Sequence, residues 1–88
     1  MDGRTQKALK NKLDKLGIVY SERKSNFSEC QVLCITDENQ GEDIILTEYN
    51  YPASLNEDLL GDIIAWLDEK GYYFECEYPG TFYIVLDY

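Results

Sequence analysis

The clearest hydrophobic pattern in the chain lies in residues 54–71, SLNEDLLGDIIAWLDEKG. At about 100° per residue, the apolar positions share one broad arc, which is the pattern of an amphipathic helix; they are Leu55, Leu59, Leu60, Ile63, Ile64, Trp66 and Leu67. Ser54 and Glu57 have the spacing of a capping box, and Gly71 stands where a left-handed terminating residue is expected. The pattern predicts a helix with one face in the core.

The opposite arc of the same helix is acidic. It holds Glu57, Asp58, Asp62, Asp68 and Glu69, with Gly61 and Ala65 among them. Lys70 is the only basic residue in this stretch. We therefore expect the helix to present a carboxylate surface to solvent.

A first helix is predicted over residues 3–16. Leu9, Leu13 and Leu16 form a narrow apolar stripe at i, i+4 and i+7, lysines occupy much of the rest, and Gly17 is a natural end. The pattern is typical of a surface helix that docks through three leucines. A nucleic-acid-binding helix is the alternative, and the acidic remainder of the chain opposes it.

The remaining apolar runs predict strands. They cover residues 18–24, 30–36, 42–49, 72–78 and 82–88, with 30–36 apolar enough to be central. Residues 25–28 are expected to form a turn, and residues 37–41 a polar hairpin loop. The order is α-β-β-β-α-β-β. Because short connections favour antiparallel neighbours, we expect a single α+β domain over residues 1–88, an antiparallel sheet of about five strands with both helices on one face.

The closing hairpin has two possible registers. A two-residue loop pairs Tyr78 with Thr81 and places apolar side chains beside polar ones, whereas a three-residue loop pairs Tyr78 with Phe82 and aligns the apolar faces. Register follows the buried face, so we expect the second. Thr81 is poorly suited to a loop position that needs positive φ, and a bulge gives the same alignment. With the apolar faces aligned, by the three-residue loop or by a bulge, the face away from the helices is expected to show Tyr73, Glu75, Glu77, Tyr83 and Asp87.

The charges are strongly segregated along the chain. The net charge is −9 in 88 residues: residues 1–24 hold seven basic and three acidic residues, whereas residues 25–88 hold one and fourteen. Such an acidic segment repels nucleic acid and anionic lipid and attracts basic surfaces. The chain has no apolar run of about 18 residues and no apolar segment near its start, so we expect no transmembrane helix, no signal peptide and a cytoplasmic location.

The chain contains no histidine and three cysteines. Cys30 and Cys34, four apart on a predicted strand, are about 13 Å apart and too distant for a disulfide. We interpret the cysteines as reduced and mostly buried. A zinc site using Cys30, Cys34 and Cys76 is the alternative, although its spacing is not a standard one. No cofactor is expected.

No catalytic pattern is present. The nucleophile-elbow, phosphate-loop and dinucleotide glycine motifs are missing, and the nuclease-like Glu22-x-Lys24 lacks an acid on a neighbouring strand. The pairs Asp37-Glu38 and Glu42-Asp43 lie at a predicted loop, where solvated carboxylates are ordinary. We therefore expect a protein that is not an enzyme.

A binding surface is the remaining functional interpretation. Glu75 and Glu77 on a strand are about 6.6 Å apart, and Asp58 and Asp62 on a helix about 6 Å apart, spacings similar to those of phosphates along a nucleic-acid strand. The chain also has eight tyrosines, and tyrosine suits interfaces. The candidate partner-binding residues are Asp58, Asp62, Glu69, Glu75, Glu77, Tyr73, Tyr83 and Asp87. The alternatives are acidity that serves only solubility and tyrosines that only complete the core.

In size, acidity and element order the chain resembles small phage-encoded inhibitors of bacterial defence, including several anti-CRISPR proteins. The helix face of Asp58, Asp62 and Glu69 and the strand with Glu75 and Glu77 carry this resemblance. It implies an acidic inhibitor, active in the host cell cytoplasm, that binds a CRISPR effector or nuclease and acts as a DNA mimic or a steric block.

The α-β-β-β-α order also resembles double-stranded-RNA-binding domains, but the acidic second helix and the extra hairpin depart from them. Two other functions stay open at this point. One is an immunity protein for a nuclease toxin. The other is an assembly or adaptor domain that dimerises through a tyrosine-rich sheet or an edge strand, so that monomer and homodimer are both possible.

Overall fold

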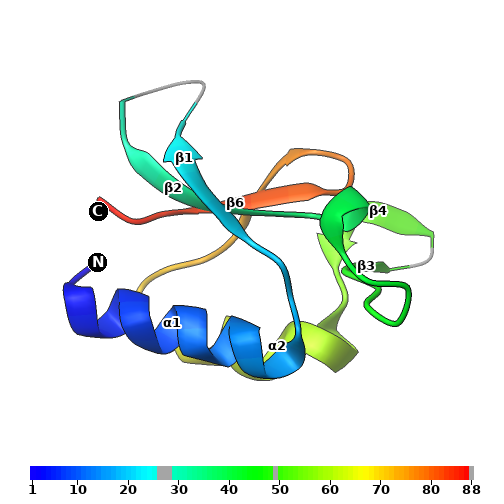
Figure 1. Ribbon diagram of the computed structural model, residues 1–88, viewed down its shortest axis with the longest axis horizontal. Helices are drawn as coiled ribbons and strands as arrows, with labels where there is room; N and C mark the ends of the chain where they lie inside the picture. Colours follow the sequence, from blue (N-terminus) through cyan, green and yellow to red (C-terminus); the bar gives the residue numbers. More distant parts are fainter. Residues whose placement is uncertain (26–28, 49, 88) are drawn as a thin grey trace.

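The computed structural model describes residues 1–25, 29–48 and 50–87 and places two helices below a twisted sheet (Figure 1). The elements in chain order are α1 (Gly3–Leu16), β1 (Ser21–Lys24), β2 (Gln31–Thr36), the 3-10 turn η1 (Asp37–Asn39), β3 (Thr47–Glu48), β4 (Tyr51–Leu55), α2 (Glu57–Glu69), β5 (Glu75–Tyr78) and β6 (Thr81–Val85). The predicted α+β class and order of elements are confirmed, with the short strand β4 added before α2.

The strands form two antiparallel sheets. The larger sheet has the order β1-β2-β6-β5, so β2 is central as predicted, and β3 pairs with β4 in a separate two-stranded ribbon. The single sheet of about five strands that we expected is therefore divided into four strands and two. Residues 26–28, in the predicted turn, and Tyr49, at the end of the predicted third strand, lie outside the described residues.

The core lies between the helices and one face of the larger sheet. Its buried members come from α1, α2, β2, β6 and the segments that flank them: Leu9, Leu13, Ile18, Leu33, Ile35, Leu46, Leu60, Ile63, Leu67, Phe82, Ile84 and Leu86. Both helices thus cover the same face, as predicted. Lys12 of α1 and Lys70 lie over the Trp66 ring, 5.0 and 5.4 Å from its centroid, where cation–π attraction joins the helices.

The predicted start of α2 is wrong, whereas its end is confirmed. Ser54 belongs to β4, and Asn56 is the residue that caps the helix, because its Oδ1 accepts the Asp58 N–H at 3.1 Å. Asn56 also donates through Nδ2 to the Ile45 carbonyl at 2.8 Å, which ties the helix start to the segment before β3. After the helix, Gly71 adopts φ 83°, the left-handed conformation that glycine tolerates best.

Residues 37–41 do not form the predicted hairpin loop. Asp37 starts η1, and its carboxylate accepts the Leu46 N–H at 3.2 Å and the Thr47 hydroxyl at 2.8 Å. Its own N–H donates to the Gly80 carbonyl at 2.9 Å. Asp37 is therefore a junction between the two sheets and not a solvated loop carboxylate. Of the strand predicted over residues 42–49, the structure shows Thr47–Glu48 as β3. The residues before β3 form a turn, in which the Ile44 N–H donates to the Gly41 carbonyl, and the Asp37 carboxylate binds the chain at Leu46 and Thr47.

The β5–β6 hairpin has the two-residue turn of the first predicted register, followed by a bulge that changes the register further along the strands. Tyr78 pairs with Thr81 across the two-residue turn Pro79-Gly80, not with Phe82, and Gly80 takes the positive φ of 87°. A bulge at Glu77 then shifts the register, so that Cys76 lies opposite Phe82 and Glu75 opposite Tyr83. The expected pairing of Tyr78 with Phe82 is therefore wrong. The bulge keeps Cys76 on the same side of the sheet as the buried Phe82, although Cys76 itself is exposed.

Candidate partner-binding surface

Three of the predicted carboxylates form an exposed row on α2. Asp58, Asp62 and Glu69 lie on the side of the helix opposite the buried Leu60, Ile63 and Leu67. Among the described residues, neither of the two salt bridges includes any of them. We call these three residues the acidic ridge.

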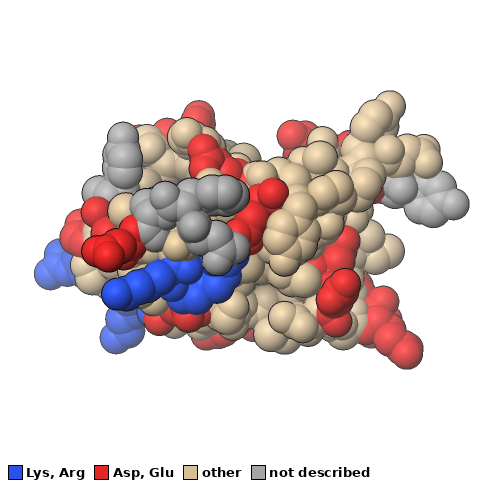
Figure 2. All heavy atoms as spheres, turned by 90° about the horizontal axis from the view of Figure 1, so that it is seen from above, with Lys and Arg blue, Asp and Glu red and all other residues tan. Residues whose placement is uncertain are grey.

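The basic residues gather in space as they do in the sequence, whereas acidic side chains also occur beside them. Figure 2 shows Lys and Arg side chains at one end of the molecule, while the other end of that face shows acidic and uncharged side chains. The cause is simple, because residues 25–69 contain no Lys or Arg. The chain therefore has an acidic end that can face a basic surface with little internal compensation.

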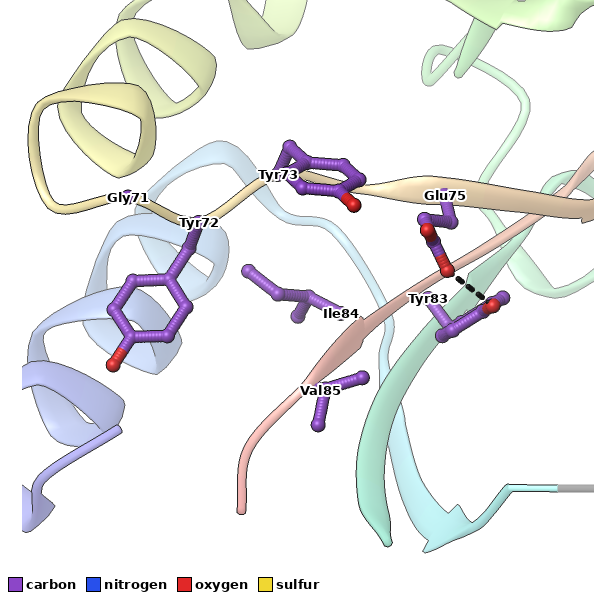
Figure 3. A pocket seen from close by; sticks show the side chains of 7 residues that line it. All are labelled: Gly71, Tyr72, Tyr73, Glu75, Tyr83, Ile84 and Val85. Carbon is purple, nitrogen blue, oxygen red and sulfur yellow. Dashed lines mark hydrogen bonds between the residues drawn. The ribbon is translucent and has the colours of Figure 1, made fainter. Parts of the chain in front are cut away.

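Glu75 and Tyr83 are paired with each other on the sheet face away from the helices. The Tyr83 hydroxyl donates to Glu75 Oε2, and Figure 3 shows this pair at one side of a pocket of about 190 Å³ that Tyr73 and Val85 also line. The hydrogen bond to the carboxylate, with partial burial, raises the pKa of Tyr83 to about 12. Both groups already have a polar partner within the chain.

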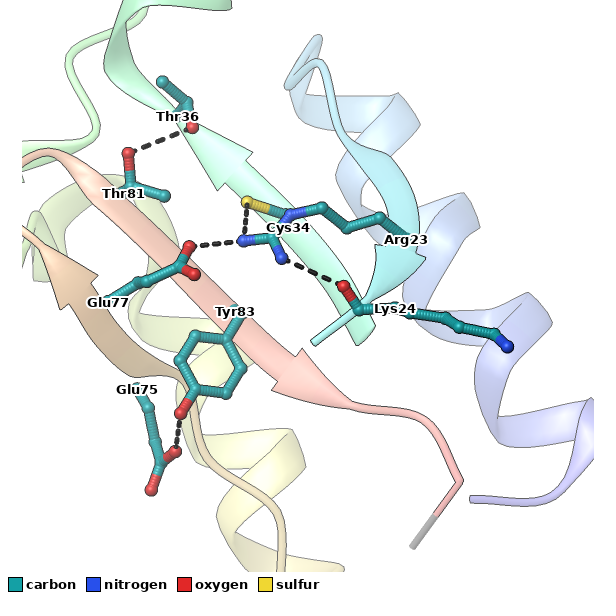
Figure 4. Close-up of polar contacts among 8 residues, drawn as sticks. All are labelled: Arg23, Lys24, Cys34, Thr36, Glu75, Glu77, Thr81 and Tyr83. Atoms are coloured by element: carbon teal, nitrogen blue, oxygen red, sulfur yellow. Dashed lines mark hydrogen bonds and ion pairs between the residues drawn. The ribbon is translucent and has the colours of Figure 1, made fainter. Parts of the chain in front are cut away.

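Glu77 is also engaged, and its expected exposure is wrong. Its side chain is only 5% exposed and forms an ion pair with Arg23, whose guanidinium reaches over Cys34 from the opposite edge strand (Figure 4). Glu77 shares this face with Glu75, because side chains two residues apart on a strand point to the same side of the sheet. A partner that required this carboxylate would first have to break the pair.

The last two predicted residues have separate positions. The Asp87 carboxylate accepts the Gln31 N–H at 2.8 Å, next to the start of β2. Tyr73 is 67% exposed and lies between the open sheet face and α2. The eight candidates therefore do not form one surface: the acidic ridge and the pair Glu75–Tyr83 lie on opposite sides of the molecule.

A groove that the sequence did not predict runs along one flank of α2. Three adjoining hollows of about 410, 270 and 400 Å³ follow the helix, and Glu57 lines all of them. We call their union the α2 groove; its main lining residues are Glu48, Glu57, Gly61, Ile64, Asp68 and Tyr73. The available sequence signal was a glycine in the middle of a predicted helix.

Other chemistry is sparse within the described ranges. Cys30 is half-buried, Cys34 buried and Cys76 exposed, so the expectation of mostly buried cysteines fails at Cys76. Across residues 1–25, 29–48 and 50–87, no three His, Cys, Asp or Glu side chains are arranged to hold a metal ion. The helices in these ranges are too short and too polar to cross a membrane.

Comparisons with known proteins returned no relative. No family model, curated protein or solved structure matches the chain.

Proposed function

We propose that this protein is a non-catalytic inhibitor that binds the basic nucleic-acid-binding surface of an enzyme, such as a CRISPR effector or a nuclease. The observation that carries the proposal is the acidic ridge, three exposed carboxylates without a described salt-bridge partner on a helix, Glu57–Glu69, that contains no Lys or Arg. Opposite charges across an interface accelerate association and select the partner.

The spacing of the ridge supports nucleic-acid mimicry. Asp58 and Asp62 are one helical turn apart, and Glu69 follows two turns later, about 10 Å further along the axis. A groove that binds phosphates of one strand meets a similar row of anionic oxygens on this helix. Arg and Lys side chains in such a groove bind carboxylates with the same charge-assisted hydrogen bonds that they make to phosphates.

An assembly domain is the second candidate, favoured by a different observation. Tyr51, Tyr73 and Tyr78 are each more than half exposed, and exposed tyrosine is typical of protein interfaces. Self-association through these rings would depend little on salt, whereas binding through the ridge weakens as salt rises.

The test starts with capture of partners from bacterial lysate at low and high salt, with identification by mass spectrometry. A captured enzyme is then assayed for binding to labelled duplex DNA as the protein is added. The ridge variant combines Asp58→Asn, Asp62→Lys and Glu69→Lys. The matched control, Glu38→Gln with Glu42→Lys and Asp43→Lys, changes the net charge equally at exposed positions outside the ridge.

We expect the wild-type protein to displace the DNA and the ridge variant to need at least ~tenfold more protein, since several interface pairs of up to ~1 kcal/mol each are lost. The control variant is expected to inhibit nearly as well as the wild-type protein. Equal inhibition by the ridge variant would refute the assigned surface. Recovery of the protein's own copies alone, at any salt, would favour assembly.

A further inference from the structure

We propose that the α2 groove binds an extended, arginine-bearing segment of the basic partner. This inference rests on the proposed function, because it identifies a second contact that would add shape recognition to the attraction of the acidic ridge.

The groove has the dimensions of a short extended peptide. It passes from Ile45 and Glu48, beside the start of α2, along the helix to Asp68. Glu57 and Asp68 are eleven residues apart on the helix, which corresponds to about 16 Å along its axis. An extended segment of about five residues covers that length.

Gly61 has no structural role that requires a glycine. It lies inside α2, its φ is not positive, and a Cβ built on it meets no atom within 4 Å. A glycine inside a helix is less favourable than alanine, because it fixes a more flexible backbone and contributes no side chain. Packing among the described residues does not require a glycine at this position, and a large side chain placed here would extend into the groove.

The walls of the groove select a guanidinium group. Glu48, Glu57 and Asp68 supply carboxylates, and Ile64 and the exposed Tyr73 ring supply apolar surface. None of the lining residues is Lys or Arg. A guanidinium donates two parallel hydrogen bonds to a carboxylate and stacks on an aromatic ring, which the ammonium of lysine does less well.

The end of α2 adds to this preference. Asp68 lies in the last turn, where the helix dipole is negative, and this potential favours a cation. The groove thus combines the carboxylates of Glu48, Glu57 and Asp68 with the aromatic ring of Tyr73 and the open space beside Gly61.

The direct test uses fluorescein-labelled peptides that alternate glycine with arginine or glycine with lysine. Anisotropy measures their binding to the wild-type protein, to Gly61→Leu, which fills the groove, and to Gly61→Ala, the matched control that adds one methyl group. We expect tighter binding of the arginine peptide than of the lysine peptide. We also expect at least ~tenfold weaker binding to Gly61→Leu, which corresponds to ~1.4 kcal/mol, and little change for Gly61→Ala.

Several results would overturn this assignment. Equal binding of both peptides would show simple charge attraction, and unchanged affinity of Gly61→Leu would place the peptide elsewhere. Sedimentation tests a further possibility. If the wild-type protein is a dimer and Gly61→Leu is a monomer, the groove binds a second copy of the chain. Circular dichroism of both variants checks that the helix content is retained.

The enzyme assay separates this inference from the proposed function. If the wild-type protein and Gly61→Leu inhibit the captured enzyme equally, the groove assignment fails and the inhibitor function stands. If the wild-type protein binds the arginine peptide through Gly61 and yet inhibits no nucleic-acid-binding enzyme, the proposed function fails and the groove stands.

Discussion

The substitution Gly61→Ala is expected to stabilise the protein. Gly61 lies within the 13 residues of α2, in a backbone conformation that alanine also adopts, and its added Cβ meets nothing within 4 Å. The difference between glycine and alanine inside a helix is about 0.8–1.0 kcal/mol. For a domain of this size, ~1 kcal/mol raises the Tm by about 4–8 °C.

The control for this prediction is the same substitution at the end of the helix. Gly71 has φ 83°, in the left-handed region. A side chain there costs roughly 1–2 kcal/mol of strain, which exceeds the ~0.4–1 kcal/mol gained by restricting the unfolded chain. Gly71→Ala is therefore expected to lower the Tm, although it adds the same methyl group as Gly61→Ala.

Thermal unfolding followed by circular dichroism, with urea titrations at 25 °C, measures both variants. The urea midpoint is expected to move in opposite directions while the slope stays constant, since the surface exposed on unfolding is unchanged. A Gly61→Ala variant that is neutral or less stable would refute the reasoning. It would mean that another group fills the space beside Gly61 in solution. A loss of stability that grows with protein concentration would identify this group as part of a second copy of the chain.

Three further experiments test the polar contacts of the fold. Asn56→Ala is expected to lower the free energy of unfolding by ~1–2 kcal/mol in urea titrations, because the helix cap and the bond to Ile45 are lost together. Tyr83 has a folded pKa of about 12, above its ordinary value of about 10, so its contribution to stability is complete below pH ~10 and is lost as pH rises towards 12. The wild-type urea midpoint should therefore fall more steeply than that of Tyr83→Phe over this range, and parallel curves would contradict the assigned bond. A double-mutant cycle with Arg23→Ala and Glu77→Gln should give a coupling energy of ~0.5–3 kcal/mol in chemical denaturation, and a value near zero would show that the pair is not formed in solution.

Periodicity predicted the helices well because it reports local geometry. The leucine stripe of α1, the end of that helix at Gly17 and the buried arc of α2 all follow from residues within a few turns of one another. The acidic ridge was predictable for the same reason. Once the buried side of α2 is known, the positions of Asp58, Asp62 and Glu69 on its exposed side follow from 100° per residue.

The errors share a different cause, which is contact between distant parts of the chain. Ser54 fits a cap by spacing alone, but β4 pairs with β3 and leaves Asn56 as the first residue able to bond both the helix and Ile45. The partner of Glu77 is Arg23, 54 residues away in the chain and on the opposite edge strand of the larger sheet. No local pattern in the sequence contains that information.

The groove escaped prediction because it is bounded by three segments that are distant in sequence. Glu48 comes from β3, Gly61 from α2, and Tyr73 from the chain before β5. Gly61 was visible on the polar arc of the helix, yet only the structure shows that no residue it describes occupies the space of the missing side chain. The sequence identified the unusual residue, and packing explained why it matters.

The contacts of the carboxylates distinguish those that stabilise the fold from those that can bind a partner. Glu75, Glu77 and Asp37 bond other parts of the chain, so their removal would weaken the fold and would confuse any binding assay. Asp62 and Glu69 have no such bond among the contacts described, and Glu69 lies in the last turn of α2, where the helix dipole favours a cation over an anion by ~0.3–1 kcal/mol. The double variant Asp62→Lys, Glu69→Lys is therefore expected to unfold at the wild-type urea concentration or slightly above it, while it loses the affinity that the ridge provides. A variant that lost stability and binding together would show that these two acids stabilise the fold. The assignment of the ridge as a binding surface would then be wrong.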